Sequence, residues 1–173
     1  MREADETAFR ALVRELQGPL FGFLGRMGLS RAHAEEIAQE TFLKVWRNWA
    51  SYGAEKGSLV TWTFAMARNL ALNAASRASM QREVPYGEHP PDVACEEPLA
   101  SEALEARQER ERLRRALLAL PPPDRALLAL IYVRELSHAD AARIEGCAVG
   151  AIKTRAHRAK ARLRQIMEEE DGR

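Results

Sequence analysis

The sequence predicts an all-α protein with two small helical domains, an acidic, proline-containing flexible linker between them, and a C-terminal helix-turn-helix. Apolar residues recur at steps of three and four along most of the chain, and strand-like alternation is nowhere convincing. Prolines and acidic residues crowd together in residues 83–98, where no apolar periodicity survives. These observations predict a first domain at 1–82, a linker at 83–98 and a second domain at 99–173.

The composition is typical of a globular protein, with 46% hydrophobic and 29% charged residues in a chain of 173. A formal net charge of +1 would argue against a nucleic-acid-binding protein if the charge were spread evenly. The distribution is uneven, because residues 43–82 hold six basic residues and one acid, whereas residues 83–106 hold seven acids and no Lys or Arg. Two basic blocks therefore flank an acidic one.

Cysteine and histidine usage gives no sign of a metal site or of catalysis. Cys95 and Cys147 are far apart and lack a histidine at metal-ligand spacing, so we expect no zinc site, no disulfide and a reducing cytoplasm. The four histidines are scattered through different predicted elements, so we expect no catalytic activity and no cofactor; they are His33, His89, His138 and His157. Neither a signal peptide nor an apolar run of about 18–20 residues is evident, so we expect no membrane insertion and a cytoplasmic location.

The first helices of the N-terminal domain are predicted from apolar spacing and from breaker residues. Residues 5–17 form one amphipathic pattern, and Gly18-Pro19 predicts a break before a second helix over 20–27. Gly28 is expected to end the second helix, and Ser30 to cap a third that runs to about Trp49.

The third helix has an outer stripe of mixed character. It contains Glu36, Gln39, Glu40, Leu43 and Arg47. A solvated helix face and a protein-docking surface both explain this composition, and spacing alone does not separate them.

A glycine-containing loop, residues 50–58, leads to a helix over 59–77 that Ser58 is expected to cap. The expected inward residues of this helix are Leu59, Trp62, Met66 and Leu70. Another face gathers amide and basic side chains, among them Arg68, Asn69 and Asn73, a mixture that suits single-stranded DNA. The tryptophans at 46, 49 and 62 fit core positions better than base-stacking platforms.

The second domain is predicted to begin with a helix over 99–120 whose buried end holds Leu113, Leu117 and Leu120. Pro121-Pro122-Pro123 ends it, and the next helix, 124–135, is expected to bury Leu127, Leu128, Leu130 and Ile131.

Residues 137–165 then form the predicted helix-turn-helix. Ser137 begins a capping box, and Gly146 is suited to the left-handed conformation at the turn. The second helix has an expected inward stripe of Val149, Ile152, Ala156, Ala159, Leu163 and Ile166. Its other faces carry six Lys and Arg residues and no acid between 149 and 165, which indicates attraction to phosphates. Beyond Met167 we expect a frayed acidic tail.

Three blocks of the chain resemble the extracytoplasmic-function sigma factors, the small promoter-recognition subunits of bacterial RNA polymerase. AEEIAQETFLKVWRNW is similar to the helix that docks on the polymerase clamp, and GSLVTWTFAMARNLALNAASR to the helix that reads the minus-ten element. LPPPDRALLALIYVRELSHADAARIEGCAVGAIKTRAHRAKARLR is similar to the domain that reads the minus-thirty-five element. The resemblance covers almost the whole chain, and the order and spacing of the blocks make it specific.

The resemblance implies a role for three sets of residues. The core-polymerase interface comprises Glu36, Gln39, Glu40, Leu43 and Arg47. The minus-ten set, expected around a base flipped out of the non-template strand, comprises Asn48, Tyr52, Lys56, Ser58, Arg68, Asn69 and Asn73. The minus-thirty-five set comprises Lys153, Thr154, Arg155, His157, Arg158 and Arg162; Arg155 and Arg162, with Arg164, are assigned to phosphates.

The resemblance also implies partners. They are core RNA polymerase, through the clamp of its largest subunit and the flap of the second largest, promoter DNA, and an anti-sigma factor. The acidic linker is expected to thread toward the RNA exit channel.

The helix-turn-helix departs from the family pattern at four positions. Family members usually have a larger aliphatic residue at Ala141 and often a leucine at Glu145, so looser packing of the first helix is expected. Ala148 and Ala151 replace the usual capping residues of the recognition helix, which predicts weaker minus-thirty-five binding.

The resulting hypothesis is an alternative sigma factor that binds core polymerase, reads a melted minus-ten element and reads the minus-thirty-five element in the major groove. The alternative is a stand-alone helix-turn-helix regulator that binds duplex DNA without polymerase. That alternative leaves the Gln39-Glu40 stripe and the TWTFAMARN block unexplained.

Overall fold

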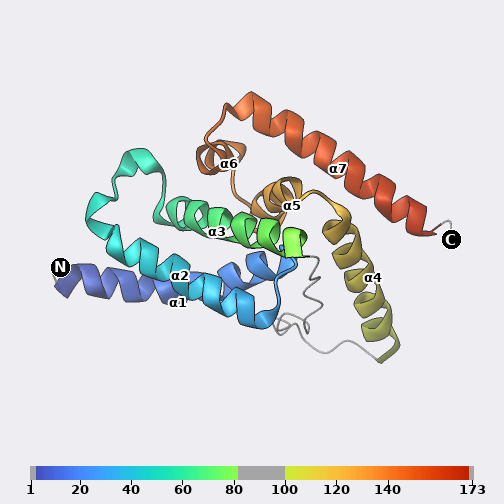
Figure 1. Ribbon diagram of the computed structural model, residues 1–173, viewed down its shortest axis with the longest axis horizontal. Helices are drawn as coiled ribbons and strands as arrows, with labels where there is room; N and C mark the ends of the chain where they lie inside the picture. The colour runs from blue at the N-terminus through green and yellow to red at the C-terminus, as the bar shows by residue number, and fades with distance from the viewer. Residues whose placement is uncertain (1–2, 82–99, 172–173) are drawn as a thin grey trace.

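The computed structural model describes residues 3–81 and 100–171, which are helical apart from short connections (Figure 1). The first unit contains α1 (Glu3–Arg26), α2 (Arg31–Arg47), two single 3-10 turns (Trp49–Ser51 and Ala54–Lys56) and α3 (Leu59–Gln81). The second unit contains α4 (Ala100–Ala119), α5 (Pro122–Leu128), a π-helical turn η3 (Ala129–Val133), α6 (His138–Glu145) and α7 (Val149–Asp171). The predicted linker lies outside the described residues, as does Cys95.

The predicted break at Gly18-Pro19 is wrong, because α1 continues through both residues. Pro19 removes one backbone donor, at a cost of about 3 kcal/mol in a helix interior. Leu16, Leu20 and Phe23 lie on the same face of the uninterrupted helix and are essentially fully buried. Each such side chain contributes about 1.5–3 kcal/mol on burial, so packing outweighs the local penalty.

Local capping chemistry confirms the predicted helix ends. The Ser30 hydroxyl accepts from the His33 backbone N–H, and the Ser58 hydroxyl accepts from that of Thr61 at 3.1 Å. In the helix-turn-helix, Ser137 Oγ accepts from the Asp140 N–H at 3.0 Å, and Gly146 ends α6 at a φ of 65°. These side chains satisfy donors that a helix start leaves unpaired.

Replacing Ser137 with alanine should therefore lower the free energy of unfolding by about 1 kcal/mol, the usual cost of a lost N-cap. Urea denaturation followed by circular dichroism measures the change. Ser76→Ala is the matched control, since Ser76 is exposed inside α3 and caps nothing, and it should leave stability within about 0.5 kcal/mol of the parent. Equal loss in both variants would contradict the capping role.

Helix α3 lies between two layers, with α1 and α2 on one side and α5 and α6 on the other (Figure 1). Its fully buried apolar residues are Phe64, Ala67 and Ala71. The inward set predicted from spacing, Leu59, Trp62, Met66 and Leu70, is only partly buried and flanks that core. The Phe64 ring stands edge-on to Phe23 of α1, with centroids 5.6 Å apart.

In the second unit, Leu127, Leu128, Leu130 and Ile131 are buried as predicted. Two other expectations are wrong, since Leu113 is 39% exposed and Val149 is 40% exposed. The acidic end is also not frayed up to Asp171: it is part of α7, and Glu170 lies 3.7 Å from Arg115 of α4.

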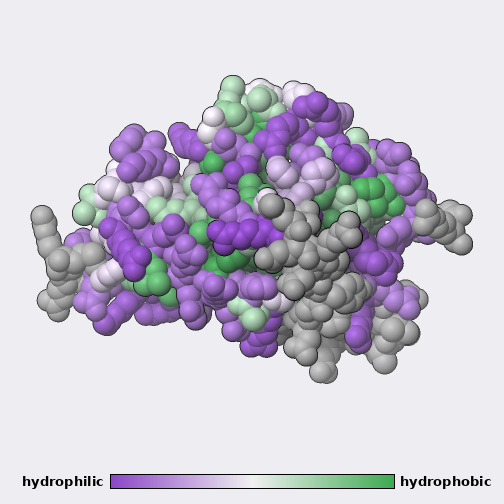
Figure 2. Space-filling view, viewed as in Figure 1, coloured by the Kyte–Doolittle hydropathy of each residue, from purple (hydrophilic) through white to green (hydrophobic). Residues whose placement is uncertain are grey.

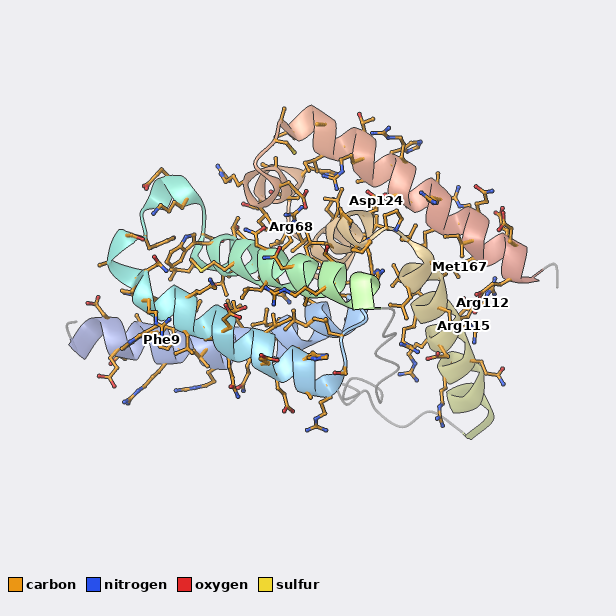
Figure 3. The ribbon with its side chains drawn as sticks, in the orientation of Figure 1. Phe9, Arg68, Arg112, Arg115, Asp124 and Met167 are labelled. Carbon is orange, nitrogen blue, oxygen red and sulfur yellow. The ribbon has the colours of Figure 1, made fainter. Side chains whose placement is uncertain are left out.

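Helix α4 packs along the second half of α7, where Figure 3 shows Arg112 and Arg115 beside Met167. Arg112 donates to the Met167 backbone carbonyl at 2.9 Å.

In the first unit, Phe9 of α1 lies against Trp46, with ring centroids 4.7 Å apart, and against Trp49 at 5.8 Å. Both tryptophans are partly buried on Phe9, and Trp49 packs against the core cluster as its spacing indicated.

The two units share a hydrophobic core. Ala126, Ala129, Leu130 and Ile144 of the second unit belong to the same buried cluster as the core residues of α1, α2 and α3. Arg125 reinforces the junction, because it donates to the Met27 carbonyl at 2.8 Å and to the Leu118 and Leu120 carbonyls of its own unit. No helix in the described ranges is long and apolar enough to span a bilayer.

Candidate DNA and polymerase interfaces

The outer stripe of α2 is exposed along its whole length. Ile37, Ala38 and Thr41 on the opposite face are buried against the first unit. The stripe residues Glu36, Gln39, Glu40, Leu43 and Arg47 are all classed as exposed, and Leu43 is 51% accessible. Glu40 pairs only loosely with Lys44, at 3.6 Å. The structure thus presents a leucine among charged and amide groups, a composition that suits protein docking as well as solvation.

The loop between α2 and α3 folds back on the start of α3. The Tyr52 hydroxyl donates to the Gly57 carbonyl at 2.8 Å, and Gly57 has a φ of 87° that favours glycine. Lys56 Nζ donates to the Ser51 carbonyl and lies 6.0 Å from the Trp62 ring. These contacts hold the loop against the first turn of α3.

Tyr52 and Trp62 form an aromatic pair at this loop, with ring centroids 5.1 Å apart. Both residues are partly buried, and Lys56 sits beside them. Half-exposed rings with an adjacent cation can stack bases and hold phosphates. Sequence reasoning placed Trp62 in the core, and Trp62 does pack, partly buried, against the core cluster. Its contact with Tyr52 makes it an additional candidate at this loop, and its place four residues after the Ser58 cap is the sequence signal that links it to the loop.

The remaining minus-ten residues are spread over a longer surface. Asn48 closes α2, with its side-chain amide donating to the Lys44 carbonyl at 2.8 Å. Asn69 and Asn73 are exposed on α3. The structure therefore brings Tyr52, Lys56 and Ser58 together in one loop and leaves the two asparagines on the following helix.

The recognition helix α7 presents five of the six predicted minus-thirty-five residues to solvent. They are Lys153, Thr154, His157, Arg158 and Arg162. The stripe beneath them, Ile152, Ala156 and Ala159, is buried. Within the described part of the chain, no carboxylate pairs with the exposed cations Lys153, Arg158 or Arg162. These side chains are available to a polyanion.

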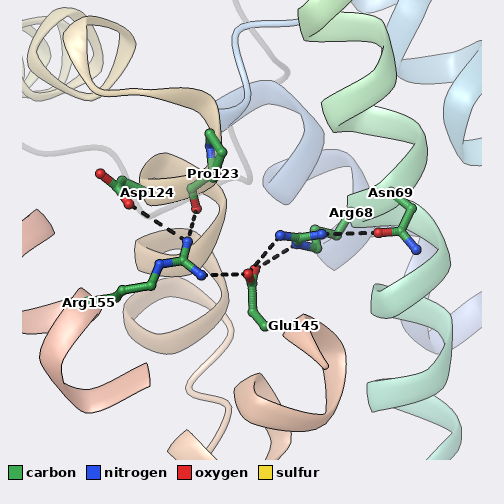
Figure 4. A network of polar contacts seen from close by, with 6 residues as sticks. All are labelled: Arg68, Asn69, Pro123, Asp124, Glu145 and Arg155. Atoms are coloured by element: carbon green, nitrogen blue, oxygen red, sulfur yellow. Dashed lines mark hydrogen bonds and ion pairs between the residues drawn. The ribbon is translucent and has the colours of Figure 1, made fainter. Parts of the chain in front are cut away.

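Arg155 is the exception among the six, because it is partly buried and donates to Glu145. Arg68, of the predicted minus-ten set, donates to the same carboxylate (Figure 4). Glu145 Oε1 accepts from Arg68 Nε at 2.6 Å, and Glu145 Oε2 accepts from Arg68 Nη2 at 2.7 Å and from Arg155 Nη1 at 2.8 Å. Only 3% of the Glu145 side chain is exposed, against 16% for Arg68 and 28% for Arg155. We call these three residues the Glu145 cluster.

Charge–charge contacts set the electrostatics of this cluster. Burial alone would lower the pKa of Arg155, but the hydrogen bond and charge of Glu145, together with the charge of Asp124 3.7 Å away, raise the pKa above its ordinary value. Arg155 also donates to the Pro123 carbonyl at 3.4 Å. Glu145 is therefore not a packing defect in place of a leucine, because its carboxylate has three charge-assisted hydrogen bonds.

One hydrogen bond and one cation–π contact also join the two units. Thr61 of α3 donates to Asp140 of α6 at 3.3 Å. The pKa of Asp140 is lowered chiefly by its hydrogen bond from Ser137, with help from Thr61 and the charge of Arg143. Arg134 lies over the Phe64 ring at 5.2 Å.

An apolar groove opens between α4, α5, η3 and α7, and sequence reasoning did not identify it. It has a volume of about 220 Å³, and Leu113, Leu117, Tyr132 and Leu163 line it. The basic residues that line the groove are Arg26, Arg125 and Lys160. Figure 2 shows apolar side chains reaching an otherwise mostly hydrophilic surface. Among the described residues, no three His, Cys, Asp or Glu side chains gather into a group that could hold a metal ion.

Taken together, the helix-turn-helix, the exposed basic face of α7 and the stripe on α2 define a two-unit helical DNA-binding protein. Residues 12–80 match the family model for Sigma-70 region 2, and residues 110–163 match that for Sigma-70 region 4. The chain is 34% identical over 165 residues to the ECF RNA polymerase sigma factor RpoE of Cereibacter sphaeroides, a match that covers 94% of this chain and 88% of that protein. The chain belongs to the ECF RNA polymerase sigma factor family.

Other relatives agree. The ECF sigma factor SigK of Mycobacterium tuberculosis is 29% identical over 166 residues, covering 95% of this chain and 88% of that one. The solved structure of the Bartonella quintana sigma factor RpoE, in complex with the anti-sigma factor NepR, has a TM-score of 0.68 and 26% identity, covering 93% of this chain and 97% of that one. CnrH, in complex with the cytosolic domain of CnrY, shares the fold at a TM-score of 0.69 and 20% identity, covering 95% and 90% of the two chains. The protein is thus an alternative sigma factor, a transcription initiation factor, and the stand-alone regulator is not supported.

Proposed function

We propose that this sigma factor docks on core RNA polymerase through the exposed stripe of α2. The observation that carries the proposal is the exposure of Leu43 amid Glu36, Gln39 and Glu40, on a helix whose other face is fully occupied by the core. A partly apolar surface with flanking acids suits a stable protein interface, in which charges set orientation and an apolar residue contributes desolvation.

The minus-ten element is read as single-stranded DNA at the loop before α3. The Tyr52–Trp62 pair supplies rings on which a base can stack, and Lys56 supplies a cation for the adjacent phosphate. Asn48, Asn69 and Asn73 supply amides that can hydrogen-bond to base edges.

The minus-thirty-five element is read in the major groove by α7. Its exposed residues near the N-terminus, Lys153, Thr154, His157 and Arg158, are those a recognition helix places on base edges. Arg162 lies further along and is assigned to phosphates.

The protein works in the bacterial cytoplasm, with no catalytic activity and no cofactor of its own. Because RpoE of Bartonella quintana was solved with an anti-sigma factor, we propose that such a factor also holds this protein inactive. The groove beside Leu113 and Tyr132 is lined by apolar atoms and fits the apolar face of an amphipathic helix from such a factor.

Run-off transcription with purified core polymerase and a promoter library tests the proposal. Core enzyme plus this protein should yield transcripts from a subset of templates that share two spaced elements, and core enzyme alone should not. If the protein binds DNA by itself but never yields a transcript with core enzyme, the proposed function is wrong.

A further inference from the structure

The Glu145 cluster joins the two units at a single buried carboxylate. Arg68 comes from α3 of the first unit, Glu145 ends α6 of the second, and Arg155 lies in the second turn of α7 (Figure 4). Arg68 binds the carboxylate in a bidentate manner at 2.6 and 2.7 Å. This planar fork-to-carboxylate geometry is directional, so it fixes how the units sit on one another.

The cluster occupies two cations that the proposed function assigns to DNA. Arg68 belongs to the minus-ten set and Arg155 to the minus-thirty-five set, yet both donate to the same glutamate. A carboxylate with three short hydrogen bonds from guanidinium groups resembles a phosphate oxygen pair in charge and geometry. While the cluster is intact, Nε and Nη2 of Arg68 and Nη1 of Arg155 donate to Glu145 and are not available to a phosphate.

The packing of the units also conflicts with reading both promoter elements at once. Elements centred about 25 base pairs apart, at about 3.4 Å per base pair, lie roughly 85 Å apart along the duplex. A packed unit of about 75 residues has a radius of gyration of only about 11 Å. Two such units that share a core, as these do, cannot reach both elements.

We propose, resting on the function proposed above, that the Glu145 cluster is an interdomain latch. It holds the free protein closed, withholds Arg68 and Arg155 from DNA, and must break before both promoter elements are engaged. Nucleic-acid phosphates compete with Glu145 for the same two arginines, so DNA binding and opening favour each other. The contacts Thr61–Asp140 and Arg125–Met27 support the closed arrangement without involving Glu145.

The test uses the full-length protein and the variant Glu145→Gln, which keeps the shape of the side chain but removes its charge. Small-angle X-ray scattering of the free wild type should match the closed structure, and the variant should have a larger radius of gyration. Glu15→Gln is the matched control, because Glu15 is exposed on α1 and lies outside every proposed interface; it should scatter like the wild type. An expanded wild type, or a variant as compact as the wild type, would overturn the latch.

Binding of a promoter-free duplex, followed by fluorescence anisotropy across a salt series, gives a second readout. With two arginines released, Glu145→Gln should bind about 10-fold more tightly than Glu15→Gln at low salt. Its plot of log affinity against log salt should be steeper by about 2, since each added phosphate contact contributes about 0.9. A variant that expands without gaining affinity would overturn the claim that the cluster withholds cations from phosphates.

The wild-type scattering stands even if Glu145→Gln fails to fold, a failure that circular dichroism detects. Run-off transcription separates the two proposals. A wild type that scatters as closed but yields no transcript with core polymerase contradicts the proposed function alone, whereas an active but expanded wild type contradicts the latch alone.

Discussion

Phe64→Ala should lower the free energy of unfolding by about 3–5 kcal/mol, the usual cost of deleting a buried phenylalanine. Phe64 is fully buried, lies edge-on to Phe23 at 5.6 Å and has Arg134 over its ring at 5.2 Å. The deletion removes apolar burial, the aromatic pair and the cation–π contact together, and it leaves a cavity between the two units. Urea denaturation followed by far-UV circular dichroism measures the loss.

Leu43→Ala is the control for this prediction, because Leu43 is 51% exposed and its truncation should change stability by no more than about 0.5 kcal/mol. The shared core further predicts that helices of both units unfold in one transition. A loss below about 1 kcal/mol in Phe64→Ala would show that this side chain does not pack as the structure has it.

Glu40→Arg should weaken binding to core polymerase by at least about 10-fold while leaving the fold intact. Reversing a charge inside a complementary interface places like charges together, which costs several kcal/mol. Glu40 is exposed, and its ion pair with Lys44 is 3.6 Å long, so stability should change little. Competition with a labelled sigma factor for core enzyme measures the affinity.

Arg158→Ala is the matched variant on the other unit. It should bind core polymerase as the wild type does and should discriminate roughly 10-fold less between its promoter and a minus-thirty-five mismatch, because one base contact contributes about 1–3 kcal/mol. Equal loss of core binding in the two variants would contradict the division of labour between α2 and α7.

The sequence by itself determined where α2, α3 and α6 begin and where the helix-turn-helix turns. Ser30, Ser58 and Ser137 cap the helices that follow them, and Gly146 adopts the left-handed conformation at the turn. These features depend on hydrogen bonds between residues three or four apart in the sequence. Such residues are close together in any helix start or turn, so the contacts form independently of the tertiary fold. The exposed stripe of α2 and the exposed face of α7 follow from helical periodicity in the same way.

The tertiary structure alone decided which residues of α3 are buried, because helices pack on two sides of it. Spacing placed Trp62 and Leu70 inward on α3, but the second unit covers another side of that helix, so Phe64 and Ala67 occupy the core. Pro19 shows the same limit of local sequence reasoning. The free-energy cost of a proline inside α1 is smaller than the stabilisation gained by burying Leu16, Leu20 and Phe23. A pattern in one helix does not specify what packs on it.

Glu145 is the clearest case. In the sequence it is an unexpected acid in a short helix, and only the fold brings it to Arg68, 77 residues away, and to Arg155. A charged residue is stable in such a buried position only when a partner arrives from elsewhere in the chain. The sequence therefore predicted surfaces for polymerase and for DNA, whereas long-range packing decided that two of the predicted DNA-binding arginines donate to a glutamate.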